Sequence, residues 1–306
     1  MKIVFLGTGA AVPSKTRKLS SIAIIRKNSG EILIFDAGEG MQYQLINAQL
    51  NIMKISKVFI SHLHGDHIFG LPGLILTLRM YQRTKPLHLY GPPGIKQYLA
   101  AVNSIAGVLD TQFELSISEI GEGIVIEEKE YVVESTLADH GIDTFAFSIV
   151  EKPYPGKFFP EKARELGIPE GQLWAKLKAG ENIQLPDGRV INSSEVVGPS
   201  RPGRKVTYSV DTRPTKSIVL LSKNSDVLIH EATFDDSLLE KAIQTGHATA
   251  GEAAKIAKDA KVKQLILTHI STRYKDTSIL YEQATKIFPN TIIAHDFLEI
   301  ALKDRK

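Results

Sequence analysis

The chain has 306 residues, of which 43% are hydrophobic, and its 37 Lys and Arg side chains nearly balance 34 Asp and Glu. This length and apolar content indicate a globular protein of one large domain or two modest ones. The chain contains no cysteine, which excludes a disulfide framework and thiolate metal ligands and fits a reducing cytoplasm.

The N-terminal residues, MKIVFLG, resemble the start of a signal peptide. Their apolar run of about five residues is nevertheless too short for a signal-peptide core or a membrane span. We therefore expect a first β-strand here, a cytoplasmic location and no membrane partner.

Short apolar runs rich in β-branched residues predict strands, and runs with helical periodicity predict helices between them. In chain order, the expected strands span 2–6, 21–26, 32–35, 57–60, 131–133, 206–210, 218–221, 227–229, 265–267 and 291–293. The expected helices span 39–48, 67–82, 94–105, 236–244, 250–260 and 277–287. Strands and helices therefore alternate, which indicates an α/β fold.

The stretch from about 151 to 205 breaks this alternation and is rich in Pro, Gly and Lys. Residues 152–205 hold ten basic and six acidic side chains, a local charge of +4 in a chain of net charge +3. This stretch is interpreted as an insertion. Its charge suits a polyanionic partner, and the alternative is a solvated lobe with a small helical hairpin.

A cluster of metal-ligand residue types follows the strand expected at 57–60. The segment 58–67 reads VFISHLHGDH and contains His62, His64, Asp66 and His67. In an extended loop, alternating positions point His62 and His64 to one side, while Gly65 permits a turn toward a second point. One loop of this kind can supply two adjacent metal ions; the alternative is a harmless polar loop.

Further polar side chains stand where other expected strands end. They are His140, Asp211, His230 and His269. Functional groups of an open sheet gather just beyond the carboxyl ends of its strands, so these side chains can converge on one rim. His88 and His295 lie within strand-like segments and are interpreted as structural.

Seven of these side chains suffice for two metal ions, with three ligands for each ion and one shared carboxylate. The first set is His62, His64 and His140, the second is Asp66, His67 and His269, and the shared carboxylate is Asp211. Water between two ions roughly 3.5 Å apart ionises near neutral pH and can act as a nucleophile. Imidazole and carboxylate donors favour Zn²⁺ and also suit Mn²⁺ or Fe²⁺.

His247 lies between two helix signals. Gly246 is well placed to end one helix, and Thr249 with Glu252 forms the capping-box pattern that starts the next. The partial positive charge of a helix N-terminus attracts phosphate. His247 is therefore a candidate functional group that His230 and Glu231 could orient, and the alternative is a linker histidine near a helix cap.

These residues resemble the metallo-β-lactamase superfamily and, more narrowly, the ribonuclease Z family, in a match that runs nearly end to end. The matching blocks are FLGTGAAVPSKTR, FDAGEGMQYQL, SHLHGDHIFGLPGLI, LADHG, VDTRP, IHEATF, GHATAGEAA and LTHISTRY. The His-x-His-x-Asp-His loop marks only the superfamily, whereas IHEATF, GHATA and THISTRY are more specific.

The resemblance implies a four-layered αββα sandwich, formed by a single domain over 1–306 with an inserted flexible arm at about 151–205. It also implies a homodimer with two divalent metal ions per subunit. The implied activity is that of an endoribonuclease that removes the 3′ trailer from precursor tRNA and leaves a tRNA 3′-hydroxyl and a 5′-phosphorylated trailer.

The resemblance also implies roles for individual residues. Asp66 resembles the general base that activates water together with the metals, and His247, supported by Glu231, resembles the group that stabilises or protonates the departing 3′ oxygen. The arm resembles the segment that grips tRNA, and its candidate contacts are Lys157, Lys176 and Lys178. A basic arm suits RNA, which is recognised largely through shape and phosphates.

Two positions depart from the family pattern. Val210 stands where the family has glycine beside the shared aspartate, and we expect metal binding to survive this loss of backbone freedom. Lys18 stands where a common bacterial form of the 13–18 loop has asparagine. That loop bears on where cleavage falls relative to a CCA end.

Two other functions use the same residues. One is a small-molecule phosphodiesterase or related hydrolase with the same metal pair, which would not need the basic arm. The other is a non-catalytic RNA-binding subunit, against which the presence of all seven candidate ligands argues.

Overall fold

The computed structural model describes residues 1–303, which divide into two compact units. We call residues 1–128, 132–150 and 205–303 the core unit, and residues 129–131 and 151–204 the arm unit. Each unit has a hydrophobic core of its own.

The core unit contains two seven-stranded sheets. The first, in spatial order, consists of β16 (Glu299–Ala301), β1 (Lys2–Gly7), β2 (Ser21–Ile25), β3 (Ile32–Phe35), β4 (Ile55–Phe59), β5 (Leu87–Gly91) and β6 (Leu115–Glu119). The second consists of β15 (Thr291–Ile293), β14 (Gln264–Thr268), β13 (Val227–Glu231), β12 (Lys205–Tyr208), β9 (Phe145–Glu151), β8 (Tyr131–Leu137) and β7 (Gly123–Glu127). Phe147 of β9 contacts Phe35 and Phe59 of the first sheet, with ring centroids 5.7 Å apart in both pairs, so the two sheets pack face to face.

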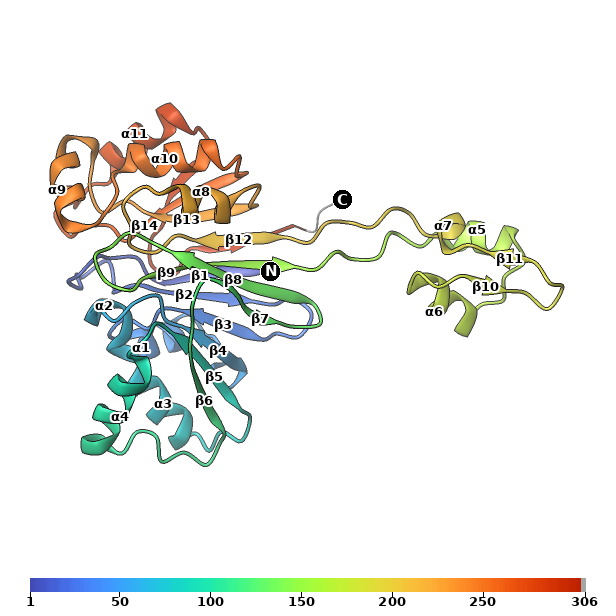
Figure 1. Ribbon diagram of the computed structural model, residues 1–306, viewed down its shortest axis with the longest axis horizontal. Coiled ribbons are helices and arrows are strands. Elements are labelled where there is room, and N and C mark those ends of the chain that lie inside the picture. Colours follow the sequence, from blue (N-terminus) through green and yellow to red (C-terminus); the bar gives the residue numbers. More distant parts are fainter. Residues whose placement is uncertain (304–306) are drawn as a thin grey trace. The chain divides into compact units, whose positions relative to one another are not determined.

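Helices cover the outer face of each sheet (Figure 1). The first sheet is covered by α1 (Met41–Asn47), α3 (Gly70–Met80) and α4 (Ile95–Ala106), with the short η1 (Ile52–Lys54) and α2 (Gly65–Ile68) nearby. The second is covered by α8 (Lys216–Ser222), η2 (Asp236–Leu238), α9 (Leu239–Thr245), α10 (Ala250–Asp259) and α11 (Ser278–Ile287). This confirms the expected four-layered αββα sandwich. Within residues 1–303, every helix falls short of the length and hydrophobicity that a membrane span needs.

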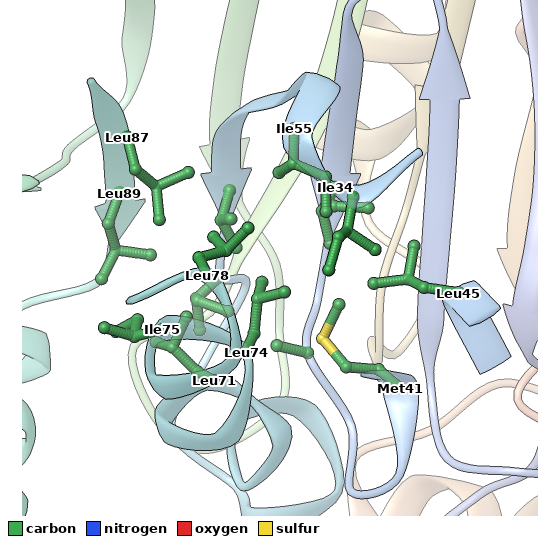
Figure 2. Packing of buried hydrophobic residues seen from close by; sticks show 14 of the residues in the cluster. Ile34, Met41, Leu45, Ile55, Leu71, Leu74, Ile75, Leu78, Leu87 and Leu89 are labelled. Atoms are coloured by element: carbon green, nitrogen blue, oxygen red, sulfur yellow. The ribbon is translucent and has the colours of Figure 1, made fainter. Parts of the chain in front are cut away.

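The spacing of apolar residues explains the packing between the first sheet and its helices. In α3, Leu71, Leu74, Ile75 and Leu78 recur at helical intervals and are all buried. Such spacing forms one apolar stripe along a helix, and Figure 2 shows this stripe facing the side chains of the strands.

Strand direction brings the functional residues to one edge of the core unit. The strands β3, β4, β5 and β6 run parallel, as do β12, β13, β14 and β15. Parallel strands have their carboxyl ends at the same edge of a sheet. Asp36 directly follows β3, and His269 directly follows β14.

The arm unit contains three short helices and a two-stranded hairpin. These are α5 (Pro160–Glu165), α6 (Gln172–Lys178), β10 (Ile183–Gln184), β11 (Val190–Ile191) and α7 (Ser193–Val196). Trp174 anchors their small core and donates its indole N–H to the Ile168 carbonyl at 3.0 Å. Where the chain enters and leaves the unit, buried Glu151 and Arg204 form an ion pair with an Oε1–Nη2 distance of 2.6 Å.

The structure corrects several sequence-based expectations. The segment expected as a strand at 218–221 lies in helix α8, and β6, β7, β9 and β16 were not expected at all. His88 lies within β5 and contacts Ser116 through Nδ1 at 2.6 Å, as suits a structural residue. His295 was interpreted as lying within a strand, but it follows β15 and is exposed.

Candidate metal centre

The histidine-rich loop after β4 consists of an extended segment followed by a short helical turn, and both parts carry candidate ligands. His62 is fully buried and lies in the extended segment after the strand, and His64 precedes the short helix α2. Gly65 begins α2, where the Phe69 ring lies so close that a Cβ atom would be 2.3 Å from it. The helical turn then places Asp66 and His67 on a second side of the site, as the loop pattern predicts.

The structure brings the seven candidate ligands together in two groups. One group is His62, His64 and His140, and the other is Asp66, His67, Asp211 and His269. Within each group, one potential ligand atom from each residue lies within 4.8 Å of the others. This cluster of imidazole and carboxylate groups is suited to binding metal ions.

Asp211 lies between the two groups. Its Oδ2 atom is 3.9 Å from His62 Nε2 and 3.8 Å from His140 Nε2 in the first group. The same atom is 3.3 Å from His67 Nε2 and 3.1 Å from His269 Nε2 in the second. A single carboxylate oxygen therefore lies within 3.9 Å of four imidazole nitrogens, which come from three separate parts of the chain.

Several polar atoms in this cluster are buried without a hydrogen-bond partner among residues 1–303. They are His62 Nε2, His67 Nε2 and Asp211 Oδ1. A buried polar atom left unsatisfied costs about 1–3 kcal/mol, so such atoms call for a partner. Because all three belong to candidate ligands, the residues present fit a bound metal.

The Nδ1 atoms of three candidate ligand histidines are held by surrounding groups. His67 Nδ1 lies 2.7 Å from Asp36 Oδ2, His140 Nδ1 lies 2.7 Å from the Gly246 carbonyl, and His269 Nδ1 lies 2.9 Å from Thr233 Oγ1. Occupied Nδ1 atoms fix the ring orientation and leave Nε2 as the metal-facing atom.

Asp36 is the functional residue that the sequence reasoning missed. Its buried carboxylate accepts hydrogen bonds from the Ser61 amide at 2.8 Å and from the Tyr208 hydroxyl at 2.8 Å, besides contacting His67. Asp36 directly follows the expected strand 32–35, so the strand-end rule that found the ligands could also have found it.

Several residues around the centre adopt the left-handed backbone conformation. Asp36, Val210 and His269 have φ angles of 60°, 57° and 54°. This conformation is unfavourable for a β-branched residue and normal for glycine. The glycine expected at position 210 is thus explained by the backbone, and Val210 adopts the same strained conformation while buried beside Asp211.

Electrostatic contacts set the charges of the ligands. Burial lowers the pKa of His62 and favours its neutral form, which is the form that binds a metal. Burial opposes ionisation of Asp211 and Asp66, but nearby histidines, including His269 and His67, hold both pKa values below their usual range. Both carboxylates are therefore anionic at neutral pH.

His247 lies at the edge of the cluster, ahead of α10. Its ring centroid is 4.8 Å from that of His140, and its Nδ1 atom is 2.9 Å from Oε1 of the fully buried Glu231. Burial alone would lower the pKa of His247, but the Glu231 carboxylate raises it to about 9. Glu231 thus orients His247, whereas His230 is turned to the backbone carbonyl of Glu231 through Nδ1 at 2.8 Å.

The helix signals around His247 are confirmed. Gly246 ends α9 with a φ of 76°, and the capping box of Thr249 and Glu252 is formed at the start of α10. These two boundaries fix the short segment that carries His247.

The ligands open into a pocket of about 290 Å³. Its walls include His64, Asp66, His140, Asp211, His247 and His269. The pocket therefore gives a substrate direct access to both ligand groups and to His247.

The three candidate RNA-contacting lysines lie in the arm unit. Lys157 precedes α5, while Lys176 and Lys178 lie in α6. The Lys178 ammonium is 4.8 Å from the centroid of the Phe158 ring. Among residues 1–303, none of the three lysines forms an ion pair with a carboxylate, so their charge is available to a partner.

Comparisons with known proteins agree with this architecture. A model of the family described as "Anti-Pycsar protein Apyc1" matches residues 1–144, and a model of the "Beta-lactamase superfamily domain" matches residues 178–270. Among solved structures, human tRNase Z, short form, has a TM-score of 0.73 and 28% identity, covering 99% of this chain and 100% of that one.

Curated relatives match the chain along its whole length. Ribonuclease Z of Methanosarcina mazei is 41% identical, covering 100% of this chain and 99% of the relative. Ribonuclease Z of Bacillus subtilis is 40% identical, with 98% of each chain covered. The chain therefore belongs to the ribonuclease Z family, with the metallo-β-lactamase fold.

Proposed function

We propose that this protein is a metal-dependent endoribonuclease that removes the 3′ trailer from precursor tRNA. The tRNA would keep a 3′-hydroxyl and the trailer a 5′-phosphate. The observation that carries the proposal is the pair of ligand groups that share Asp211 at the base of an open pocket. Full-length relatives named ribonuclease Z support the choice of substrate.

The two ligand groups would each hold one divalent cation, with Asp211 between them. The donor set of imidazoles and carboxylates favours Zn²⁺ and also suits Mn²⁺ or Fe²⁺. When bound, the cations would supply positive charge that lowers the pKa of water and offsets the charge of a phosphodiester.

Asp66 would serve as ligand and general base. Its carboxylate lines the pocket, and its Oδ2 lies 3.5 Å from His67 Nε2 and 3.4 Å from His269 Nε2. The lowered pKa of Asp66 keeps it ionised, as both roles require. The same low pKa makes it a weak base, so its contribution would come from its fixed position beside the attacking water.

His247 would protonate the departing 3′ oxygen. With a pKa raised to about 9, its imidazole carries a proton at neutral pH. Its Nδ1 atom is directed at Glu231, which leaves Nε2 as the atom that can face the substrate. Glu231 is held in turn by the Thr212 amide at 2.9 Å and the Thr233 hydroxyl at 2.7 Å.

The arm unit would bind the body of the tRNA. Lys157, Lys176 and Lys178 supply positive charge on a unit that has its own folded core. Because A-form RNA is recognised mostly through its shape and phosphates, such a unit can add affinity without base-specific contacts.

A homodimer is also proposed, with an apolar surface of α1, α3 and Phe69 as the contact between two copies. The side chains of this surface are each at least 40% exposed: Tyr43, Ile46, Phe69, Leu76, Met80 and Tyr81. Thr77 donates to Gln42 across the two helices at 2.7 Å, so the helices present these side chains on adjoining surfaces. Apolar patches of this kind on a soluble domain are characteristic of protein interfaces.

The substitution Asp66→Ala tests the metal centre. It should lower turnover of precursor tRNA by several orders of magnitude while leaving tRNA affinity largely intact, because the centre and not the arm is altered. Asp110→Ala, at a highly exposed carboxylate on the surface, is the matched control. Elemental analysis of wild type should find two metal equivalents per chain. A non-catalytic RNA-binding subunit would instead show no difference between the two variants.

The substitution His247→Ala tests the protonation step. Turnover of precursor tRNA should fall by about 10²–10⁴-fold, the range typical for loss of a general acid. Hydrolysis of bis(p-nitrophenyl) phosphate should change little, because p-nitrophenolate leaves without a proton. His295→Ala, at an exposed histidine, is the control. Equal losses on both substrates would show that His247 acts in some other way.

Replacing Lys157, Lys176 and Lys178 together by Ala tests the arm. KM for precursor tRNA should rise, and the salt dependence of log K should weaken by roughly one unit for each phosphate that the variant no longer neutralises. Hydrolysis of bis(p-nitrophenyl) phosphate should persist, as it should after deletion of residues 155–200. The matched triple variant replaces the exposed Lys255, Lys258 and Lys286 of the core unit. A small-molecule phosphodiesterase would not distinguish the two triple variants.

Ile46→Asp combined with Met80→Asp tests the homodimer. Charges buried against an apolar partner surface cost several kcal/mol each, so the double variant should sediment as a monomer at concentrations where wild type is a dimer. Ile105→Asp, at a side chain that is 91% exposed on α4, should leave the sedimentation unchanged. A wild-type monomer, or a dimer that survives the double substitution, would refute the proposed contact surface.

A further inference from the structure

The segment 8–18, which follows β1, forms one wall of the metal pocket. Ala10, Ala11 and Val12 line the pocket beside the ligands. The Ala11 amide donates a hydrogen bond to Asp66 Oδ2 at 2.9 Å, from a backbone with a φ of 56°. This segment is therefore in direct contact with the carboxylate proposed as the general base.

The same segment is also joined to the chain beside His269. The Ala10 amide donates to the Ile270 carbonyl at 3.1 Å, and the Ile270 amide donates to the Thr8 carbonyl at 2.9 Å. Residues 8–11 thus connect the neighbour of one ligand with the carboxylate of another. A shift of this segment would therefore move the groups that surround Asp66 and His269.

Asp296 holds both ends of the segment, although it is not a candidate ligand. Its Oδ1 atom accepts the Thr8 hydroxyl at 2.8 Å, and its Oδ2 atom accepts the Lys18 amide at 2.8 Å. Gln44 Nε2 approaches the same Oδ2 at 3.2 Å. One carboxylate therefore closes residues 8–18 into a loop and ties it to α1.

Other contacts make this loop compact. Arg17 Nη1 donates to the Thr8 hydroxyl at 2.8 Å and to the Ala294 carbonyl at 2.6 Å. Gly7 lies so close to Leu19, the residue just after the loop, that a Cβ atom would be 1.8 Å from the Leu19 carbonyl oxygen. The loop ends are thus locked together by close backbone packing and by the contacts to Asp296.

We propose that Asp296 is a positioning residue, which fixes the 8–18 loop and through it the hydrogen bond from the Ala11 amide to Asp66. The proposal rests on the proposed function for its RNA measurements only. Asp66 is proposed to act both as a metal ligand and as the general base. A fixed hydrogen-bond donor to its Oδ2 atom holds the carboxylate in one orientation. Misplacing a catalytic group by about 1 Å can cost on the order of 100-fold in rate.

The substitution Asp296→Asn tests this role, because an amide nitrogen cannot accept a hydrogen bond. The variant therefore loses either the bond from Thr8 or the bonds from Lys18 and Gln44, and one side of the loop is released. Amide hydrogen exchange in residues 8–18 should become faster. The kcat for precursor tRNA should fall by about 10- to 100-fold with KM unchanged, and the product ends should spread over more than one position. Metal content should equal that of wild type, which separates loss of positioning from loss of the centre.

Glu299→Gln is the matched control, since it is the same chemical change three residues away. Glu299 is exposed, and its ion pair with Lys2 has an Oε1–Nζ distance of 2.8 Å at the surface, where such pairs contribute little. A role of Asp296 in stability alone would lower the melting temperature without altering kcat per folded molecule or the distribution of product ends. That result would overturn the proposal.

Two further measurements keep the test decisive. If Asp296→Asn is not recovered folded, Thr8→Val removes a donor to the same carboxylate while preserving shape, and it should reproduce the faster exchange and the lower kcat. Unchanged exchange and kcat in Thr8→Val would then refute the proposal. If wild type fails to cleave precursor tRNA, the proposed substrate is wrong, whereas exchange and bis(p-nitrophenyl) phosphate hydrolysis still measure the effect of Asp296.

Discussion

The position of one carboxylate oxygen, Asp211 Oδ2, is the constraint on which the site depends. Four imidazole nitrogens lie within 3.9 Å of it, contributed by the loops after β4, β8 and β14 and by the start of α2. Burial and the neighbouring imidazoles oppose protonation of His62, and a buried carboxylate without neutralising partners is unfavourable. Bound cations would stabilise both kinds of group, because they accept the lone pairs of unprotonated imidazole nitrogens and neutralise the charge of the carboxylate.

Meeting this constraint requires support from residues that are not candidate metal ligands. Asp36 accepts hydrogen bonds from two other parts of the chain and contacts His67, while Thr233 contacts both His269 and Glu231. Left-handed backbone conformations at Asp36, Val210 and His269 cost of order 1–3 kcal/mol each. The cost is largest at Val210, because its side chain is β-branched. The packing of the surrounding sandwich must offset this strain.

The sequence allows the candidate ligands to be identified because several of them lie at a recognisable break in an apolar pattern. His62, Asp211 and His269 follow buried strands, and parallel strands bring such breaks together. Asp36 follows the same rule but was overlooked, since a single aspartate after a strand carries no distinctive spacing. Its three-dimensional contacts with His67 and Tyr208 show how it supports the site.

Other errors arose where local patterns are ambiguous. The run SIVLL in α8 is rich in β-branched residues and suggests a strand, yet Thr215 caps a helix by accepting the Ile218 amide at 3.2 Å. Burial of Ile218 and Ser222, one helical turn apart, then stabilises that helix by tertiary packing. Strands β6 and β7 are short and only partly buried, so their apolar content is too low to predict them. Strand pairing across the sheet, which no local pattern reports, determines these elements.

The excess positive charge of the chain lies in residues 152–205, away from the candidate metal ligands in the sequence. Residues 152–205 carry +4 and the whole chain carries +3, so the rest of the chain has a net charge of −1. If the protein binds RNA as proposed, the residues outside 152–205 would offer little long-range attraction without cations, and residues 152–205 would supply most of it. In the arm unit, the Lys178 ammonium packs over Phe158, which restricts a long side chain. In the proposed RNA complex, this order would lower the entropy lost on binding, so a small, independently packed unit could contribute affinity while the core unit remains shaped around its candidate metal ligands.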